Sequence, residues 1–213
     1  MDTLIVNEQE IDIPQGWEDV TFDKFLKFSK LIKNIFVDDD KEEVDDIEKT
    51  LRNLKDNTKI LSFWTDNTEE EISMWDLEDA HKVMTKLNFT QEEYNPISIG
   101  SFTIGEETFI LPEELMTKSS FGRYIEAEQL EMQQSLIEKG DLDYLPKQIA
   151  ILAKKEGEEE KLNDDLIDER AEKFKQLDMA TVWDVGFFLQ KLEQKYILHS
   201  LISQEVTETQ KQQ

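Results

Sequence analysis

The sequence predicts an α+β fold that is predominantly helical and consists of two tandem pseudo-repeats, each a short β-hairpin followed by helices. Three observations indicate this class. Apolar residues flank turn residues at two places, although residues 4–6 alternate poorly. Long stretches at helical spacing follow each place, and the two halves present these signals in the same order. The predicted repeats cover residues 1–95 and 96–203, and residues 204–213 are expected to form a polar tail.

The first half opens with a hairpin that ends at Pro14, because proline has no backbone N–H to donate to a neighbouring strand. Thr21 is then a candidate N-cap for an aromatic-rich helix that stops near Val37. Residues 38–48 carry a run of acidic side chains. Their mutual repulsion predicts a solvated loop that leads into the start of the next helix, where carboxylates favour the helix dipole.

Two more helices are predicted before the midpoint of the chain. The first extends to about Trp64, and its apolar residues at helical spacing are Ile47, Leu51, Leu54, Ile60 and Leu61. The second starts at Thr68, which stands three residues before Glu71 as in a capping box, and it extends to Phe89.

The second half repeats the opening pattern. Residues 98–104 and 108–111 alternate around Gly105 and Glu106, which predicts a hairpin, and Pro112 ends it. Helices are then expected over residues 121–139, 145–155 and 164–177, and a long final helix capped by Thr181 and reaching about Ile202.

The two openings resemble each other closely enough to predict an internal duplication. Residues 6–14 match residues 104–112. Residues 21–25 match residues 120–124 if one residue is inserted between the two matching segments of the second half. The aligned aromatic residues are expected in the core, where a buried ring contributes about 1.5–3 kcal/mol. These pairs are Phe22 with Phe121 and Phe25 with Tyr124.

Composition narrows the possible functions. The formal charge of −25 opposes nonspecific binding to nucleic acid, and the absence of cysteine excludes disulfides and thiolate chemistry. Few residue patterns in the sequence are typical of catalytic sites. The chain has two histidines, and it contains no glycine-rich phosphate loop and no nucleophile elbow. The acidic run from Asp38 fails the calcium-loop pattern, because Glu43 and Lys49 stand where glycine and glutamate are needed. We therefore expect no enzyme activity, no catalytic or cofactor-binding residue and no metal site.

The sequence also bears on location and partners. No apolar run approaches the length of a membrane span, and the amino terminus lacks the pattern of a secretion signal. The expectation is a soluble intracellular protein that contacts neither membrane nor nucleic acid directly. Its oligomeric state stays open.

The last predicted helix has the strongest apolar character. Residues 182–189 are apolar on nearly all sides, with Asp184 as the only charge, so burial on two faces is one interpretation. The other is that one face accepts a helix from a partner protein. The candidate partner-binding residues are Trp183, Phe187, Phe188 and Leu192.

Several segments resemble small proteins of tailed bacteriophages that are described as tail assembly chaperones or as uncharacterised virion proteins. The segments that carry the resemblance are residues 17–22, 121–126, 151–159, 169–174 and 185–189. The resemblance implies a non-enzymatic assembly protein in the host cytoplasm that binds the tape-measure protein, covers its apolar stripe and keeps it soluble without a nucleotide. The alternatives are a structural component of the virion, at head or tail, and an acidic DNA mimic that inhibits a host protein.

Overall fold

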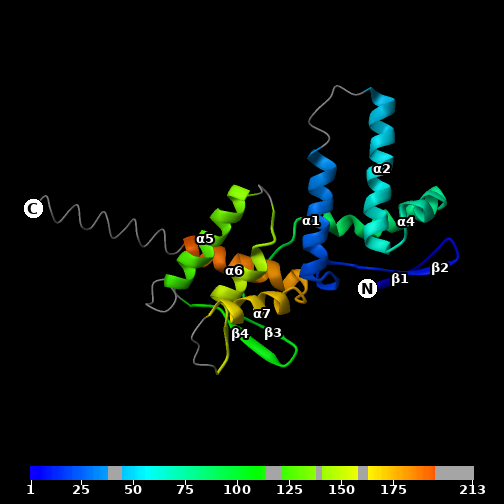
Figure 1. Ribbon diagram of the computed structural model, residues 1–213. Coiled ribbons are helices and arrows are strands. Elements are labelled where there is room, and N and C mark those ends of the chain that lie inside the picture. Colours follow the sequence, from blue (N-terminus) through cyan, green and yellow to red (C-terminus); the bar gives the residue numbers. More distant parts are fainter. Residues whose placement is uncertain (38–44, 114–120, 138–140, 158–162, 195–213) are drawn as a thin grey trace, which may run out of the picture. The chain divides into compact units, whose positions relative to one another are not determined.

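The computed structural model describes residues 1–37, 45–113, 121–137, 141–157 and 163–194. It confirms an α+β fold with predominant helices and two small antiparallel sheets, in which hairpins are followed by helices (Figure 1). The chain forms two compact units, Met1–Tyr94 and Asn95–Gln213. The duplication of one unit from the other stays a prediction.

The first unit begins with the predicted hairpin. Strands β1 (Asp2–Val6) and β2 (Gln9–Ile13) pair antiparallel, with Val6 opposite Gln9. Asn7 and Glu8 form the two-residue turn with φ angles of 48° and 66°. Positive φ at both turn residues gives the twist that joins two antiparallel strands tightly.

A 3-10 turn, η1 (Trp17–Asp19), leads to α1 (Phe22–Val37). The predicted cap is confirmed, since the Lys24 backbone N–H donates to Thr21 Oγ1 at 3.2 Å. Helix α2 (Asp46–Thr65) lies beside α1, and Asp45 caps it by accepting from the Glu48 backbone N–H at 2.8 Å (Figure 1). Residues 38–44 of the acidic segment lie outside the described residues.

The predicted single helix from Thr68 to Phe89 is wrong, because the structure divides it into three pieces. They are α3 (Glu69–Ser73), α4 (Leu77–Lys86) and η3 (Leu87–Thr90). The division follows from a second cap inside the apolar pattern: the Asp76 side chain accepts from the Asp79 backbone N–H at 2.8 Å and starts a new helix. The capping box of Thr68 and Glu71 is confirmed.

Trp64 lies at the centre of the aromatic core of the first unit. Its ring centroid is 4.9 Å from that of Phe28, 5.3 Å from Phe63 and 6.2 Å from Phe89. The Lys24 ammonium lies 5.4 Å from the Trp64 ring centroid, within the range of a cation–π contact. This cluster fixes the lower, carboxyl-terminal half of α2 against α1.

Polar contacts attach the hairpin to α4. The Asn7 backbone N–H donates to Asp79 Oδ2 at 3.0 Å, and Lys86 pairs with Asp2 at 2.7 Å. The hydrogen bond from Asn7 is the main reason that the pKa of the Asp79 carboxyl lies below its usual value. The hydrogen bond and the charge of Lys86 lower the pKa of Asp2 in the same way.

The second unit contains a three-stranded sheet rather than a hairpin alone. Strands β3 (Ser101–Ile104) and β4 (Glu107–Ile110) form the predicted hairpin around Gly105, whose φ of +61° suits glycine. Strand β5 (Lys154–Lys155) pairs with the other edge of β4.

The predicted helix over residues 145–155 is therefore too long. Helix α6 (Leu145–Leu152) stops before Ala153, which is extended. The next backbone groups bond to the sheet, and the Glu156 N–H donates to the Thr108 carbonyl at 2.9 Å. Pairing with an existing strand edge overrides the local helical preference of the two lysines.

The other helices of this unit are α5 (Phe121–Ile137), α7 (Asp164–Phe174) and a helix over residues 179–194. The cap predicted for the last helix is wrong by three positions. Asp178 caps it, accepting from the Thr181 backbone N–H and hydroxyl, each at 2.8 Å. Residues 195–202 of the predicted helix lie outside the described residues.

Three phenylalanine rings form the core of the second unit between the sheet and α7. Phe174 meets Phe102 and Phe109 edge-on, with centroids 5.2 Å and 4.8 Å away. Arg170 is buried beside them, with its guanidinium 5.6 Å from the Phe109 centroid. Glu107 pairs with both Lys155 and Lys173, which links β4 to β5 and to α7.

Candidate functional site

The amino-terminal half of α2 carries a row of exposed apolar side chains. Ile47, Leu51 and Leu54 have exposed fractions of 74%, 62% and 54%, and their spacing places them on one face of the helix. We call these three residues the α2 apolar row. The buried residues of the same helix, Leu61, Trp64 and Thr65, all lie in its carboxyl-terminal half.

The arrangement of the first unit explains this exposure. The hairpin and α4 lie beside the lower, carboxyl-terminal part of α2, whereas its upper part extends away from them (Figure 1). Isolated helices of this length are marginal in water, because most helical stability comes from packing of an apolar face. The row is therefore a packing surface that the described residues leave largely open.

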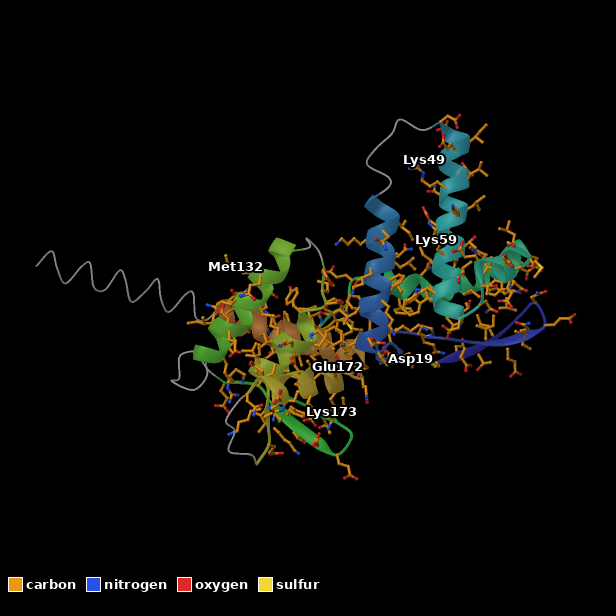
Figure 2. The ribbon with its side chains drawn as sticks, viewed as in Figure 1. Asp19, Lys49, Lys59, Met132, Glu172 and Lys173 are labelled. Carbon is orange, nitrogen blue, oxygen red and sulfur yellow. The ribbon has the colours of Figure 1, made fainter. Side chains whose placement is uncertain are left out.

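Basic side chains surround the row in an otherwise strongly acidic protein. The cations of this helix are Lys49, Arg52, Lys55 and Lys59. Figure 2 shows Lys49 close to the upper end of α2 and Lys59 further along the helix. Lys59 pairs with Asp56 at 3.0 Å, and within the described ranges no ion pair involves Lys49 or Lys55. The upper half of α2 thus combines apolar contact area with exposed side chains of both charges, since Asp46 and Glu48 stand among these cations.

The sequence-predicted partner-binding residues lie together on the 179–194 helix, but they are less exposed than the α2 row. Trp183, Phe187 and Phe188 are half-buried, and Leu192 is only 8% exposed. The Lys191 ammonium covers the Phe187 ring at 4.2 Å from its centroid. Their role in partner binding stays a prediction, with Leu192 contributing mainly to packing within the unit.

The surroundings of this helix are acidic. The Tyr124 hydroxyl donates to Glu193 Oε1 at 3.2 Å. Burial, followed by the charges of Glu193 and Glu131, raises the pKa of the Glu128 carboxyl. Three carboxylates, those of Glu128, Glu131 and Glu193, therefore lie near one another on this side of the second unit.

Metal-binding clusters and membrane-spanning helices are both absent from the described residues. No group of three or more histidine, cysteine or acidic side chains there is placed to hold a metal ion. None of the described helices combines the length and the apolar character that crossing a membrane requires. The chemistry offered by the α2 row is noncovalent packing.

Comparison with known proteins gave no match. No protein-family model, no curated protein and no solved structure matches the chain.

Sequence reasoning recognised the residues of the row but not their role. Their helical spacing was consistent with a core-facing stripe, and spacing alone does not show whether another element covers the stripe. Charge does not single out the row either, because α1 carries as many cations as α2, namely Lys24, Lys27, Lys30 and Lys33.

Proposed function

We propose that this chain is a non-enzymatic bacteriophage assembly protein that binds the tape-measure protein and keeps it soluble, as tail assembly chaperones do. The resemblance of five segments to such proteins supports the proposal. Under this proposal, the protein acts in the host cytoplasm during assembly.

The α2 apolar row is the single observation that carries the proposal. From Ile47 to Leu54 the row is about 10 Å long, the length of two helical turns. Residues at positions i, i+4 and i+7 form the usual contact line between two packed helices. A chaperone for a long apolar helix needs such a line to be exposed before its client arrives.

The charge distribution suits a transient role. A net charge of −25 keeps separate complexes apart in solution, while apolar contacts provide the affinity. Release then requires no nucleotide, because tail-tube subunits that bind the same stripe of the tape-measure protein displace the chaperone by competition.

The test is co-expression of this chain with its proposed client, the tape-measure protein. The triple variant Ile47→Ser, Leu51→Ser, Leu54→Ser removes most of the apolar contact area of the row. Since burying a leucine-sized side chain contributes about 1.5–3 kcal/mol, we expect the soluble fraction of the tape-measure protein to fall at least tenfold. Centrifugation followed by quantitative immunoblotting measures that fraction.

The matched control is Ile5→Ser, which removes an equally exposed apolar side chain (71%) from β1. The control is expected to keep the tape-measure protein soluble. Equal solubility with the wild type and the triple variant would contradict the proposal.

A structural role in the virion makes a different prediction. Mass spectrometry of purified virions would then find the chain at a fixed stoichiometry, whereas a chaperone is absent or present only in traces. Persistent stoichiometric presence would contradict the chaperone function.

A further inference from the structure

We propose that the upper half of α2 pairs with the same segment of a second copy of this chain, in an antiparallel arrangement. The inference uses the same surface as the proposed function but does not depend on it, because self-pairing needs no client.

The spacing of the row is that of an antiparallel two-helix seam. Ile47, Leu51, Leu54 and Thr58 alternate by four and three residues, the pattern that places side chains along one contact line between helices. The Thr58 hydroxyl donates to the Leu54 carbonyl at 2.9 Å, so its polar atom is satisfied within its own helix. In the antiparallel register, Leu51 packs against Leu54 of the other copy, and Ile47 packs against Thr58.

Charge complementarity selects this orientation. The register that aligns the apolar residues also brings Glu48 of each copy next to Lys55 of the other, which gives two symmetric ion pairs at the border of the seam. Both side chains are exposed, and in the part of the chain that the structure describes neither one forms an ion pair. A neutral polar pair, Thr50 with Asn57, borders the opposite side.

The shape of the first unit also favours the antiparallel arrangement. The hairpin and α4 of each copy lie beside the lower, carboxyl-terminal part of α2 (Figure 1). Antiparallel pairing places these parts at opposite ends of a seam about 17 Å long. Parallel pairing would place them side by side.

The seam is short, so the dimer is weak. It buries less than the ~1,200 Å² typical of stable complexes, and the charge of −25 on each copy opposes association. Self-pairing is therefore concentration-dependent. A salt concentration of about 0.15 M favours it, because the repulsion between the two negatively charged copies then extends over only about 8 Å. A dimer of this kind covers the α2 row until a stronger partner displaces the second copy.

The experiment uses two charge-reversal variants of the full chain, Glu48→Lys and Lys55→Glu, which leave the apolar row intact. Each variant alone places like charges opposite one another in both symmetric pairs, and its dimerisation constant is expected to weaken by about tenfold. An equimolar mixture restores opposite charges in both pairs, so a heterodimer at least as strong as the wild-type dimer is expected.

Sedimentation velocity at chain concentrations up to about 100 µM measures association. The proposal is overturned if the wild type stays monomeric over that range, or if the mixture associates no more than the separate variants do. Circular dichroism of each variant checks that α2 remains folded. Because Glu48→Lys leaves the row and the basic side chains of α2 unchanged, this variant still keeps the tape-measure protein soluble under the proposed function, and so the two proposals fail independently.

Discussion

Replacing Phe174 with alanine is expected to lower the free energy of unfolding of the second unit by about 3–5 kcal/mol. Phe174 is fully buried, and its ring is the common neighbour of Phe102 and Phe109. Its loss opens a cavity between α7 and the sheet that surrounding side chains fill only in part. Folded domains have only about 5–15 kcal/mol of stability, so a large fraction is lost.

Hydrogen exchange resolved by peptide measures this effect in each unit. Faster exchange is expected throughout α6, α7 and β4, whose amides depend on the same core. The matched control is Ile110→Ala on the exposed side of β4, which is expected to change the free energy of unfolding by less than about 1 kcal/mol. Equal effects of the two substitutions would contradict this description of the core.

Replacing Trp64 with alanine is expected to cost the first unit a similar amount, about 3–5 kcal/mol. Trp64 is 1% exposed and contacts aromatic rings from α1, α2 and η3. Removing the indole separates the lower half of α2 from these neighbours. Urea denaturation followed by the fluorescence of Trp17 and Trp75, in a variant that also carries Trp183→Phe, measures the loss in this unit.

Two further substitutions test whether the loss comes from packing of the Trp64 ring in the lower half of α2. Trp64→Phe keeps most of the ring and removes an Nε1–H that has no hydrogen-bond partner among the described residues, so a smaller loss of about 1–2 kcal/mol is expected. Leu51→Ala, on the exposed part of the same helix, is expected to stay within about 0.5 kcal/mol of the wild type. A loss from Leu51→Ala as large as that from Trp64→Ala would contradict the division of α2 into packed and exposed halves.

Local signals predicted much of the fold. Both hairpins follow from alternating residues around tight turns, and the Thr21 cap and the Thr68 capping box follow from side chains that bond to nearby backbone N–H groups. These interactions involve residues a few positions apart, and the sequence displays them directly.

Elements that depend on distant neighbours were predicted less well. Lys154 and Lys155 have no strand signal of their own and become β5 only because the edge of β4 is available. Two helix starts were missed for a local reason instead, because several possible caps stand close together: the break before α4 was not predicted, and the cap of the 179–194 helix was placed three residues too late. The caps that the structure uses are Asp76 and Asp178. The side chain of each accepts a hydrogen bond from the backbone N–H three residues later.

The sequence also predicted the candidate site only in part. Apolar spacing identified two amphipathic surfaces, residues 183–192 and the α2 row, without indicating which one the fold covers. Packing within the second unit buries Leu192 and half-buries Trp183, whereas α2 extends past its neighbours and leaves Leu51 exposed. Whether a neighbouring element buries an apolar helix face depends on the relative lengths of the packed elements, and a periodic pattern does not encode those lengths.

The most direct test of the central claim is backbone hydrogen exchange of the chain with and without its tape-measure protein. A chain concentration of about 1 µM keeps self-pairing negligible. If the α2 row binds the client, amides of residues 46–57 exchange at least tenfold more slowly in the complex. Unchanged exchange in residues 46–57, together with new protection confined to residues 179–194, would contradict the claim and would assign binding to the other helix.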